Sequence, residues 1–190
     1  METVYIEDKS FEKVDYAKEQ IGKANYENCQ FINCNFSNTD LSKIKFTDCE
    51  FIGSNLSMVK LQKTALLDAK FKDCKLLGLH FETCDEFALS VYFENCILNF
   101  SSFYKTKLKK TTFKDSSIQE ADFTEADLTK SIFDNCDLLK TKFENSILEG
   151  VDFRTSYNYS IDPEMNRIKK AKFSPAGIHG LLDKYDIEIE

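Results

Sequence analysis

Large apolar residues recur at every fifth position over most of this chain. The run in the second half has no exception: Phe93, Leu98, Phe103, Leu108, Phe113, Ile118, Phe123, Leu128, Phe133, Leu138, Phe143, Leu148 and Phe153. The first half keeps the same spacing in a different phase: Ile6, Phe11, Tyr16, Ile21, Tyr26, Phe31, Phe36, Leu41, Phe46, Phe51, Leu56, Leu61, Leu66, Phe71, Leu76 and Phe81. A period of five matches neither a strand nor a helix. It predicts an internal repeat, as in solenoid proteins.

The residue two positions before each of these anchors is usually small. In the second half the small residues are Val91, Cys96, Ser101, Thr106, Thr111, Ser116, Ala121, Ala126, Ser131, Cys136, Thr141, Ser146 and Val151. Most of the first half agrees, with Lys9, Glu19, Ile44 and Leu79 as exceptions. Residues two apart on an extended segment point to the same side, so both can point inward. The remaining step must turn a corner, and four such repeats close a square coil of twenty residues.

Residues twenty apart carry like side chains, which supports the square coil. The expected columns are Phe11, Phe31, Phe51 and Phe71; Phe93, Phe113, Phe133 and Phe153; Phe103, Phe123 and Phe143; and Leu108, Leu128 and Leu148. The columns also explain a composition of 17 Phe and 8 Tyr without Trp. Only 6 Gly and 2 Pro are present, because a repeat rather than hairpin turns reverses the chain.

Several of these repeats resemble a known family. Cys-Asn-Phe at 34–36, Thr-Asp-Leu at 39–41, Ala-Asp-Phe-Thr-Glu at 121–125 and Ala-Asp-Leu-Thr-Lys at 126–130 are similar to the A(D/N)LXX repeat of pentapeptide-repeat proteins. The resemblance covers about residues 4–153 and implies an all-β fold, a right-handed quadrilateral β-helix of about seven coils. Stacked at about 4.8 Å, these coils would make a rod of about 35 Å. We expect this β-helix to occupy residues 1–153.

The repeat changes phase between residues 82 and 92. Two repeats plus two residues separate the anchors on either side, and the next anchor position holds Glu86, a poor occupant of an apolar core. Phe87 and Leu89 are the candidates to replace it. The alternatives are a two-residue corner bulge that exposes Glu86, or a protrusion of Asp85, Glu86 and Phe87 that contacts a partner.

The segment 154–190 departs from the repeat. Its first twenty residues are basic and irregular, and Ser174 followed by Pro175 then predicts a helix, with Ser as the N-cap and Pro at the first helical position. An apolar stripe follows at helical spacing: Ile178, Leu181, Leu182 and Tyr185. Residues 186–190 alternate as in a short strand. The stripe either only caps the last coil or also joins two copies in a homodimer.

This C-terminal segment resembles the helix and strand at the end of the Qnr-type quinolone-resistance proteins, a branch of the pentapeptide-repeat family. The resemblance implies a homodimer through the C-terminal segment. It also implies protection of a type II topoisomerase, DNA gyrase or topoisomerase IV, from quinolones by a rod that imitates duplex DNA. Gyrase-protecting members often carry two longer loops, whereas only the break at 82–92 interrupts the coils here. The alternative is a structural or scaffold solenoid that binds another protein partner.

Charge and composition exclude several other classes. A formal net charge of −7 over 190 residues argues against nucleic acid as a direct ligand. No apolar run approaches the roughly 18 residues that a membrane-spanning helix needs. The first residues lack the basic and apolar regions of a signal peptide. We therefore expect a cytoplasmic protein that does not contact a membrane.

The cysteines and histidines predict no metal, cofactor or catalytic site. All seven cysteines stand at the small inward position, where a thiol acts as a small buried hydrophobe: Cys29, Cys34, Cys49, Cys74, Cys84, Cys96 and Cys136. His80 precedes an anchor and should face outward, and His179 lies in the C-terminal segment. Neither belongs to a nucleophile or acid–base motif. We expect a protein without enzymatic activity, in a reducing compartment.

Acidic residues concentrate in residues 113–153. This acidic belt consists of Asp115, Glu120, Asp122, Glu125, Asp127, Asp134, Asp137, Glu144, Glu149 and Asp152, against Lys114, Lys130, Lys140 and Lys142. Over two coils, or about 10 Å of rod, its charge density approaches that of duplex DNA. A basic patch of Lys105, Lys107, Lys109 and Lys110 precedes it. The belt is our candidate for the topoisomerase contact; the alternative is an ordinary solvated surface.

Overall fold

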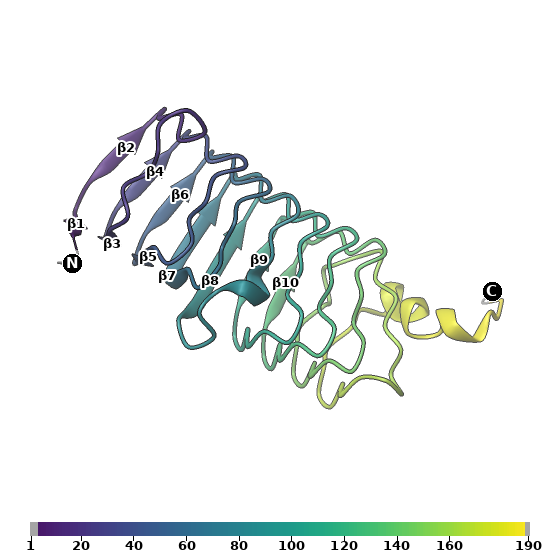
Figure 1. Ribbon diagram of the computed structural model, residues 1–190. Helices are drawn as coiled ribbons and strands as arrows, with labels where there is room; N and C mark the ends of the chain where they lie inside the picture. Colours follow the sequence, from purple (N-terminus) through teal and green to yellow (C-terminus); the bar gives the residue numbers. More distant parts are fainter. Residues whose placement is uncertain (1–3, 189–190) are drawn as a thin grey trace.

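A computed structural model describes residues 4–188 and shows a rod of stacked coils with its two ends far apart (Figure 1). Each strand pairs in parallel with a strand one coil away, so that Phe31 lies between Phe11 and Phe51. The strands are β1 (Tyr5–Glu7), β2 (Ser10–Glu12), β3 (Asn25–Glu27), β4 (Gln30–Ile32), β5 (Lys45–Thr47), β6 (Glu50–Ile52), β7 (Ala65–Lys72), β8 (Leu89–Glu94), β9 (Thr112–Lys114) and β10 (Ile132–Asp134). The predicted all-β fold, a solenoid of stacked coils, is confirmed.

The rod has four faces, each built from one pentapeptide per coil. Face 1 is anchored by Ile6, Tyr26, Phe46, Leu66, Leu89, Leu108, Leu128, Leu148 and Ile168, and face 2 by Phe11, Phe31, Phe51, Phe71, Phe93, Phe113, Phe133, Phe153 and Phe173. Face 3 is anchored by Tyr16, Phe36, Leu56, Leu76, Leu98, Ile118 and Leu138, and face 4 by Ile21, Leu41, Leu61, Phe81, Phe103, Phe123 and Phe143. Where no strand is formed, isolated parallel bridges such as Ser102 with Asp122 continue the stacking.

Stacked rings fill the interior, and one ladder runs through the phase break. The Phe31 and Phe51 rings lie 4.9 Å apart and nearly parallel, and the Phe113 and Phe133 rings 4.6 Å apart. Phe71 stacks on Phe93 at 5.3 Å across the break. The two Phe columns that the sequence separates are therefore one ladder on face 2. Rings on different faces meet edge to face across the interior, as Phe31 with Phe36 and Phe113 with Phe123, which suits the aromatic quadrupole.

The small inward residues also bind the backbone of the preceding coil. The hydroxyl of Ser54 donates to the carbonyl of Phe31 at 3.0 Å, and the thiol of Cys74 donates to the carbonyl of Phe51 at 3.2 Å. All seven cysteines are free and buried, as their place in the repeat predicts. Ser and Cys suit this position because each is small and carries one donor for a buried carbonyl group.

Each corner is made by a residue in the left-handed backbone region. The last residue of nearly every pentapeptide has a positive φ, as at Asn33 (53°), Asp48 (50°) and Lys130 (61°). Gly78 (62°) is needed at its corner for a second reason, because an added Cβ would lie 2.7 Å from the Met58 sulfur. One left-handed residue per repeat replaces the Gly- and Pro-rich turns of ordinary β proteins.

The two extra residues of the phase break lie between the buried Cys84 and Leu89. The short 3₁₀ helix η1 (Phe81–Thr83) precedes the loop, and β8 resumes the ladder with a register shift. Leu89 packs against the core as the new anchor, whereas the Phe87 side chain is 89% exposed. Figure 1 shows the loop leaving the rod beside β8. Of the two candidate anchors, Leu89 is correct.

Coil stacking continues past residue 153, where the sequence pattern predicts its end. Parallel bridges join Ile147 to Arg167 and Asp152 to Lys172, and the Phe173 ring stacks on Phe153 at 5.5 Å. The repeat is concealed because Asn166 occupies a small inward position. Its buried amide donates to the Phe143 carbonyl at 2.6 Å, as a Ser hydroxyl does elsewhere.

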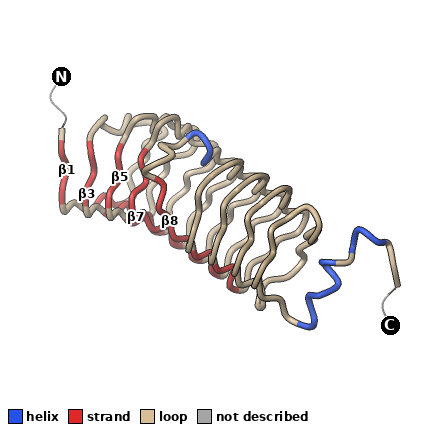
Figure 2. The backbone as a smooth tube through the Cα atoms, turned by 90° about the horizontal axis from the view of Figure 1, so that it is seen from below, coloured by secondary structure: helices blue, strands red, loops and turns tan. Residues whose placement is uncertain are grey.

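The C-terminal segment forms two 3₁₀ helices, η2 (Pro175–Leu181) and η3 (Asp183–Tyr185), which extend from the end of the rod (Figure 2). Ser174 is the N-cap, as predicted, and its hydroxyl accepts from the Gly177 N–H at 3.2 Å. The helix winds over Tyr159 so closely that a Cβ on Gly177 or Gly180 would overlap it. Residues 186–188 form no strand, and the last two residues of the predicted strand lie outside the described range.

Candidate protein-binding surface

The structure distributes the acidic belt over all four faces of the rod. Consecutive pentapeptides lie on consecutive faces, so a belt in sequence becomes a ring in space. Face 1 receives Asp127 and Glu149; face 2 receives Asp115, Asp134 and Asp152; face 3 receives Glu120 and Asp137; and face 4 receives Asp122, Glu125 and Glu144. No single face holds the charge density that the summed belt suggested.

Several belt carboxylates already have cationic partners. Glu125 lies 3.4 Å from the Lys105 ammonium, Asp127 lies 3.1 Å from Lys109, and Glu149 lies 2.6 Å from the Arg167 guanidinium. The Arg154 guanidinium binds Asp152 at 2.8 Å and holds the pKa of that carboxyl below its usual range. Lys105 and Lys109 belong to the basic patch that precedes the belt in sequence.

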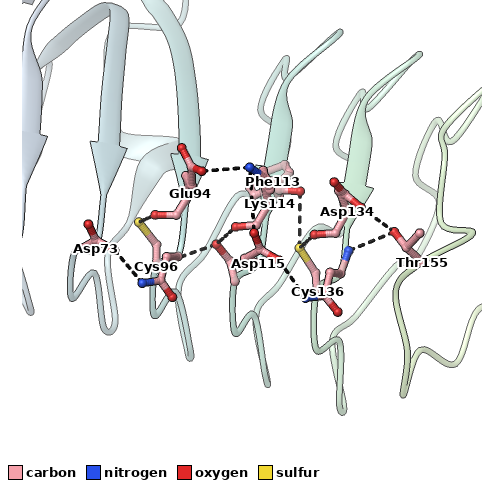
Figure 3. A network of polar contacts seen from close by, with 12 residues as sticks. Asp73, Glu94, Cys96, Phe113, Lys114, Asp115, Asp134, Cys136 and Thr155 are labelled. Atoms are coloured by element: carbon pink, nitrogen blue, oxygen red, sulfur yellow. Dashed lines mark hydrogen bonds and ion pairs between the residues drawn. The ribbon is translucent and has the colours of Figure 1, made fainter.

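Other belt carboxylates hold the backbone in shape. The carboxylates of Asp122, Asp127 and Asp137 each accept a hydrogen bond from the backbone N–H two residues later, at 2.8, 3.1 and 3.2 Å. Asp115 accepts from the Asn135 amide at 2.7 Å and Asp134 from the Thr155 hydroxyl at 2.8 Å, which links neighbouring coils (Figure 3). Asp and Asn at these positions therefore have a structural use in the fold itself.

Face 4 has the largest excess of acids in the C-terminal half of the rod. Its acidic face comprises Asp122, Glu125 and Glu144, with Glu120 at the adjoining corner and Asp162 and Glu164 on the next coil. The sequence pattern missed Asp162 and Glu164. They flank Pro163, which lies one coil after the anchor Phe143 and so occupies the next anchor position of face 4. Lys184 of η3 binds both, at 2.7 Å each, which raises the pKa of its ammonium.

The loop at the break lies at the corner between faces 4 and 1. Glu86 pairs with Lys107 at 2.6 Å, and the same ammonium lies 5.8 Å from the centre of the Phe87 ring. Asp85 is exposed and binds the backbone N–H of Phe87 at 3.0 Å. The loop thus presents an exposed aromatic ring and acids from the side of the rod, next to the lysines of the following coil.

The C-terminal stripe is divided between the rod and solvent. Leu181 packs against the core and Leu182 is half-buried, whereas Ile178 and Tyr185 are 48% and 51% exposed. A 3₁₀ helix repeats every three residues, so the four side chains do not form one straight stripe as they would on an α-helix. Part of the stripe covers the last coil, and part remains available for contact.

Within residues 4–188, no group of three or more His, Cys, Asp or Glu side chains has the arrangement of a metal site. His80 faces outward, as predicted, and binds Glu82 at 2.8 Å. No helix in the described part of the chain has the length and apolar character to cross a bilayer.

The fold and the repeat identify the class of protein. The chain belongs to the pentapeptide-repeat family: the family model for the pentapeptide repeat region matches residues 24–86 and 89–158. The break between the two matched ranges coincides with the exposed loop at Phe87.

Among solved structures, the chain resembles full-length QnrB1, a plasmid-mediated fluoroquinolone resistance protein, with a TM-score of 0.61 and 17% identity, over 96% of this chain and 100% of that chain. It also resembles HetL, a pentapeptide-repeat protein involved in heterocyst differentiation regulation from the cyanobacterium Nostoc sp. strain PCC 7120, with a TM-score of 0.62 and 12% identity, over 90% of this chain and 86% of that one. A comparison with curated proteins found no match. The QnrB1 likeness confirms the Qnr-type fold.

Proposed function

We propose that this protein is a non-catalytic rod that binds a type II topoisomerase, DNA gyrase or topoisomerase IV, and protects it from quinolones by occupying a DNA-binding surface. The observation that carries the proposal is the acidic face on face 4. Six carboxylates lie on three successive coils, about 14 Å of rod, with two cations among them: Lys142 on the same face and Lys184 bound to Asp162 and Glu164. The net charge is one negative per about 3.6 Å, against one per about 1.7 Å in duplex DNA. The QnrB1 likeness supplies the drug class.

A homodimer through the C-terminal segment is the second part of the proposal. The exposed Ile178 and Tyr185 side chains lie at the end of the rod, beyond the acidic face. A two-fold contact through them would place two acidic faces on either side of the axis, lengthening the DNA-like surface. The exposed loop at Phe87 is a further candidate contact with the topoisomerase.

A supercoiling assay with DNA gyrase, ciprofloxacin and titrated protein tests the function. We expect the wild type to restore supercoiling, or to inhibit it at high concentration. Glu120→Lys with Glu144→Lys should abolish both effects, because it reverses two charges of the acidic face. The fold should tolerate the change, because among residues 4–188 neither carboxylate has an ion-pair partner that would be left unpaired. Glu12→Lys with Glu19→Lys makes the same charge change at the far end of the rod and should have no effect. No rescue and no inhibition at molar excess would refute the proposal.

A scaffold function with a different protein partner is the second candidate. The compensation of Glu125, Asp127, Glu149 and Asp152 by bound cations favours it, because a DNA mimic needs free negative charge. This function predicts that capture experiments recover a partner other than a topoisomerase. It also predicts that charge reversal at Glu120 and Glu144 leaves gyrase activity unchanged.

A further inference from the structure

The outer residues of face 1 reverse their charge at the middle of the rod. The corner column of this face, read from one end to the other, is Asp8, Asn28, Asp48, Asp68, Lys110, Lys130, Gly150 and Lys170, with Ser90 of β8 in the place between Asp68 and Lys110. Ser90 is the central residue, and its hydroxyl donates to Asp68 at 2.7 Å. Each Asp before Ser90 has a Lys at the same distance after it, and the uncharged Asn28 has the uncharged Gly150.

The outward residues on either side of the face 1 anchors also carry opposite charges at equal distances from the centre. Glu7 stands four coils before the centre and Lys169 four coils after it, while Lys45 and Asp127 stand two coils on either side. The one like-charged pair is Glu27 with Glu149, and Glu149 is bound to Arg167. Figure 2 shows β1, β3, β5 and β7 side by side along the acidic half of this face.

A two-fold axis converts this order into attraction between two copies. An axis that lies in the interface and crosses the rod at Ser90 makes two rods antiparallel. Each column then lies opposite the same column of the second copy, with its coils in the reverse order. The contacts it brings together are Asp8 with Lys170, Asp48 with Lys130, Asp68 with Lys110, Glu7 with Lys169 and Lys45 with Asp127, each formed twice.

Most of the side chains that would meet are exposed and, within residues 4–188, unpaired; the exceptions are Lys45 and Asp127, which are half-buried, and Asp127 is also bound to Lys109. Among the described residues, Asp48, Lys110, Lys130 and Lys170 take part in no ion pair, and all four are exposed. The exposed Phe87 ring belongs to the central coil, where a two-fold axis brings two copies of the same residue together. Exposed apolar side chains at the centre of a charged surface are typical of an interface.

We propose that face 1 is a self-association surface on which a second copy of this chain binds side by side and antiparallel. The face is about 40 Å long and about 10 Å wide, roughly 400 Å² per copy, the size of a weak and reversible interface. The occupant is a second copy rather than a polyanion, because a polyanion as long as the rod would be repelled by the acidic half. This interface is separate from the C-terminal contact and does not depend on the proposed function.

Charge-swap variants test the interface by analytical ultracentrifugation, in the wild type and in an Ile178→Asp background that removes the proposed C-terminal contact. One variant carries Lys110→Glu, Lys130→Glu and Lys170→Glu, and the other Asp8→Lys, Asp48→Lys and Asp68→Lys. Each alone should lose side-by-side association, whereas their mixture, or one chain with all six changes, should regain it.

All six positions are corners at which the fold already accepts Asp, Lys or Glu. The matched control, Lys43→Glu, Lys63→Glu and Lys140→Glu, alters corners of other faces and should associate normally.

Salt dependence and cross-linking complete the test. Raising NaCl from about 50 mM to about 300 mM should weaken wild-type association by about tenfold or more. A zero-length carbodiimide should join Asp48 of one copy to Lys130 of the other, a pair about 19 Å apart within one chain. A wild type without salt-sensitive association, or swapped variants whose mixture stays unassociated, would overturn the proposal. If the protein instead stays monomeric and binds duplex DNA through Lys110, Lys130 and Lys170, face 1 is a nucleic-acid surface and the proposal is wrong.

Discussion

The two halves of the rod, before and after the phase break, have the same interior and opposite charges on face 1. Phe31 stacks on its two neighbours at 5.0 and 4.9 Å, and Phe113 on its neighbours at 5.2 and 4.6 Å. Outside, the corner of face 1 is acidic before Ser90 and basic after it. In a solenoid the inward residues specify the coil, and the outward residues are left for contact with partners.

The comparison predicts that removing one ring costs the same in both halves. Phe31→Ala and Phe113→Ala should each lower the free energy of unfolding by about 3–5 kcal/mol, because each leaves a ring-sized cavity between two stacked neighbours. Phe87→Ala, at an exposed ring, is the control and should change it little. Urea denaturation measures all three, and a large difference between the two ladder variants would show that the halves are not energetically equivalent.

Buried thiols should make both halves sensitive to high pH. Burial raises the pKa of Cys49 in the first half and of Cys136 in the second from 9.0 to about 12. The folded state therefore holds these protons more tightly. Its stability is intact below about pH 9 and should fall above it, by up to about 1.4 kcal/mol per pH unit for each thiol.

Urea midpoints at pH 7 and pH 10 measure this loss of stability. Cys49→Ala and Cys136→Ala should each make the free energy of unfolding fall less steeply with pH. In the native protein at pH 8 the thiols should also resist a disulfide reagent, and all seven should react after unfolding. Rapid reaction of the native protein would contradict the burial of these thiols.

The C-terminal end should differ from the rest of the rod in its response to surface changes. Ile178→Asp places a charge on a side chain that is 48% exposed, so it should leave folding intact and yield a monomer with respect to the C-terminal contact. Light scattering measures the mass. Leu181→Asp should also yield a monomer, with some loss of stability because Leu181 packs on the core. An unchanged mass for Ile178→Asp would refute this contact.

The smallest expected effect concerns an aromatic corner. Phe100 is 60% exposed and adopts a φ of 61°, a conformation that Asn accepts more readily than Phe. Phe100→Asn should therefore raise the free energy of unfolding by about 0.5–1 kcal/mol. Phe87→Asn, at the other exposed Phe, is the control and should be neutral. Destabilisation by Phe100→Asn would indicate that the Phe100 ring makes a packing contact that matters.

The sequence pattern was most informative about the interior and least about the surface. The anchors and the inward cysteines follow from a spacing that needs no tertiary information. Asn166 concealed one further coil, because its amide replaces a small residue only when the carbonyl of Phe143 lies within reach. The predicted helix forms as the 3₁₀ helix η2, in which Gly177 and Gly180 leave the space that Tyr159 occupies.

The acidic belt shows why the binding surface could not be predicted in the same way. Residues five apart in sequence are on adjacent faces, so neighbours in the list of acids, such as Asp122 and Asp127, point in different directions. Residues twenty apart become neighbours at about 4.8 Å. Asp127 therefore meets Lys109, and the acids of face 4 gain Asp162 and Glu164.

The sequence by itself determined that the chain folds into a square coil, because every inward position is defined by a local period of five and by the size of two side chains. Only the tertiary structure decided which outward side chains share a surface. Stacking brings residues of different coils together, and the two residues inserted near Phe87 set the register between the halves. The charge reversal on face 1 is visible only once that register is known.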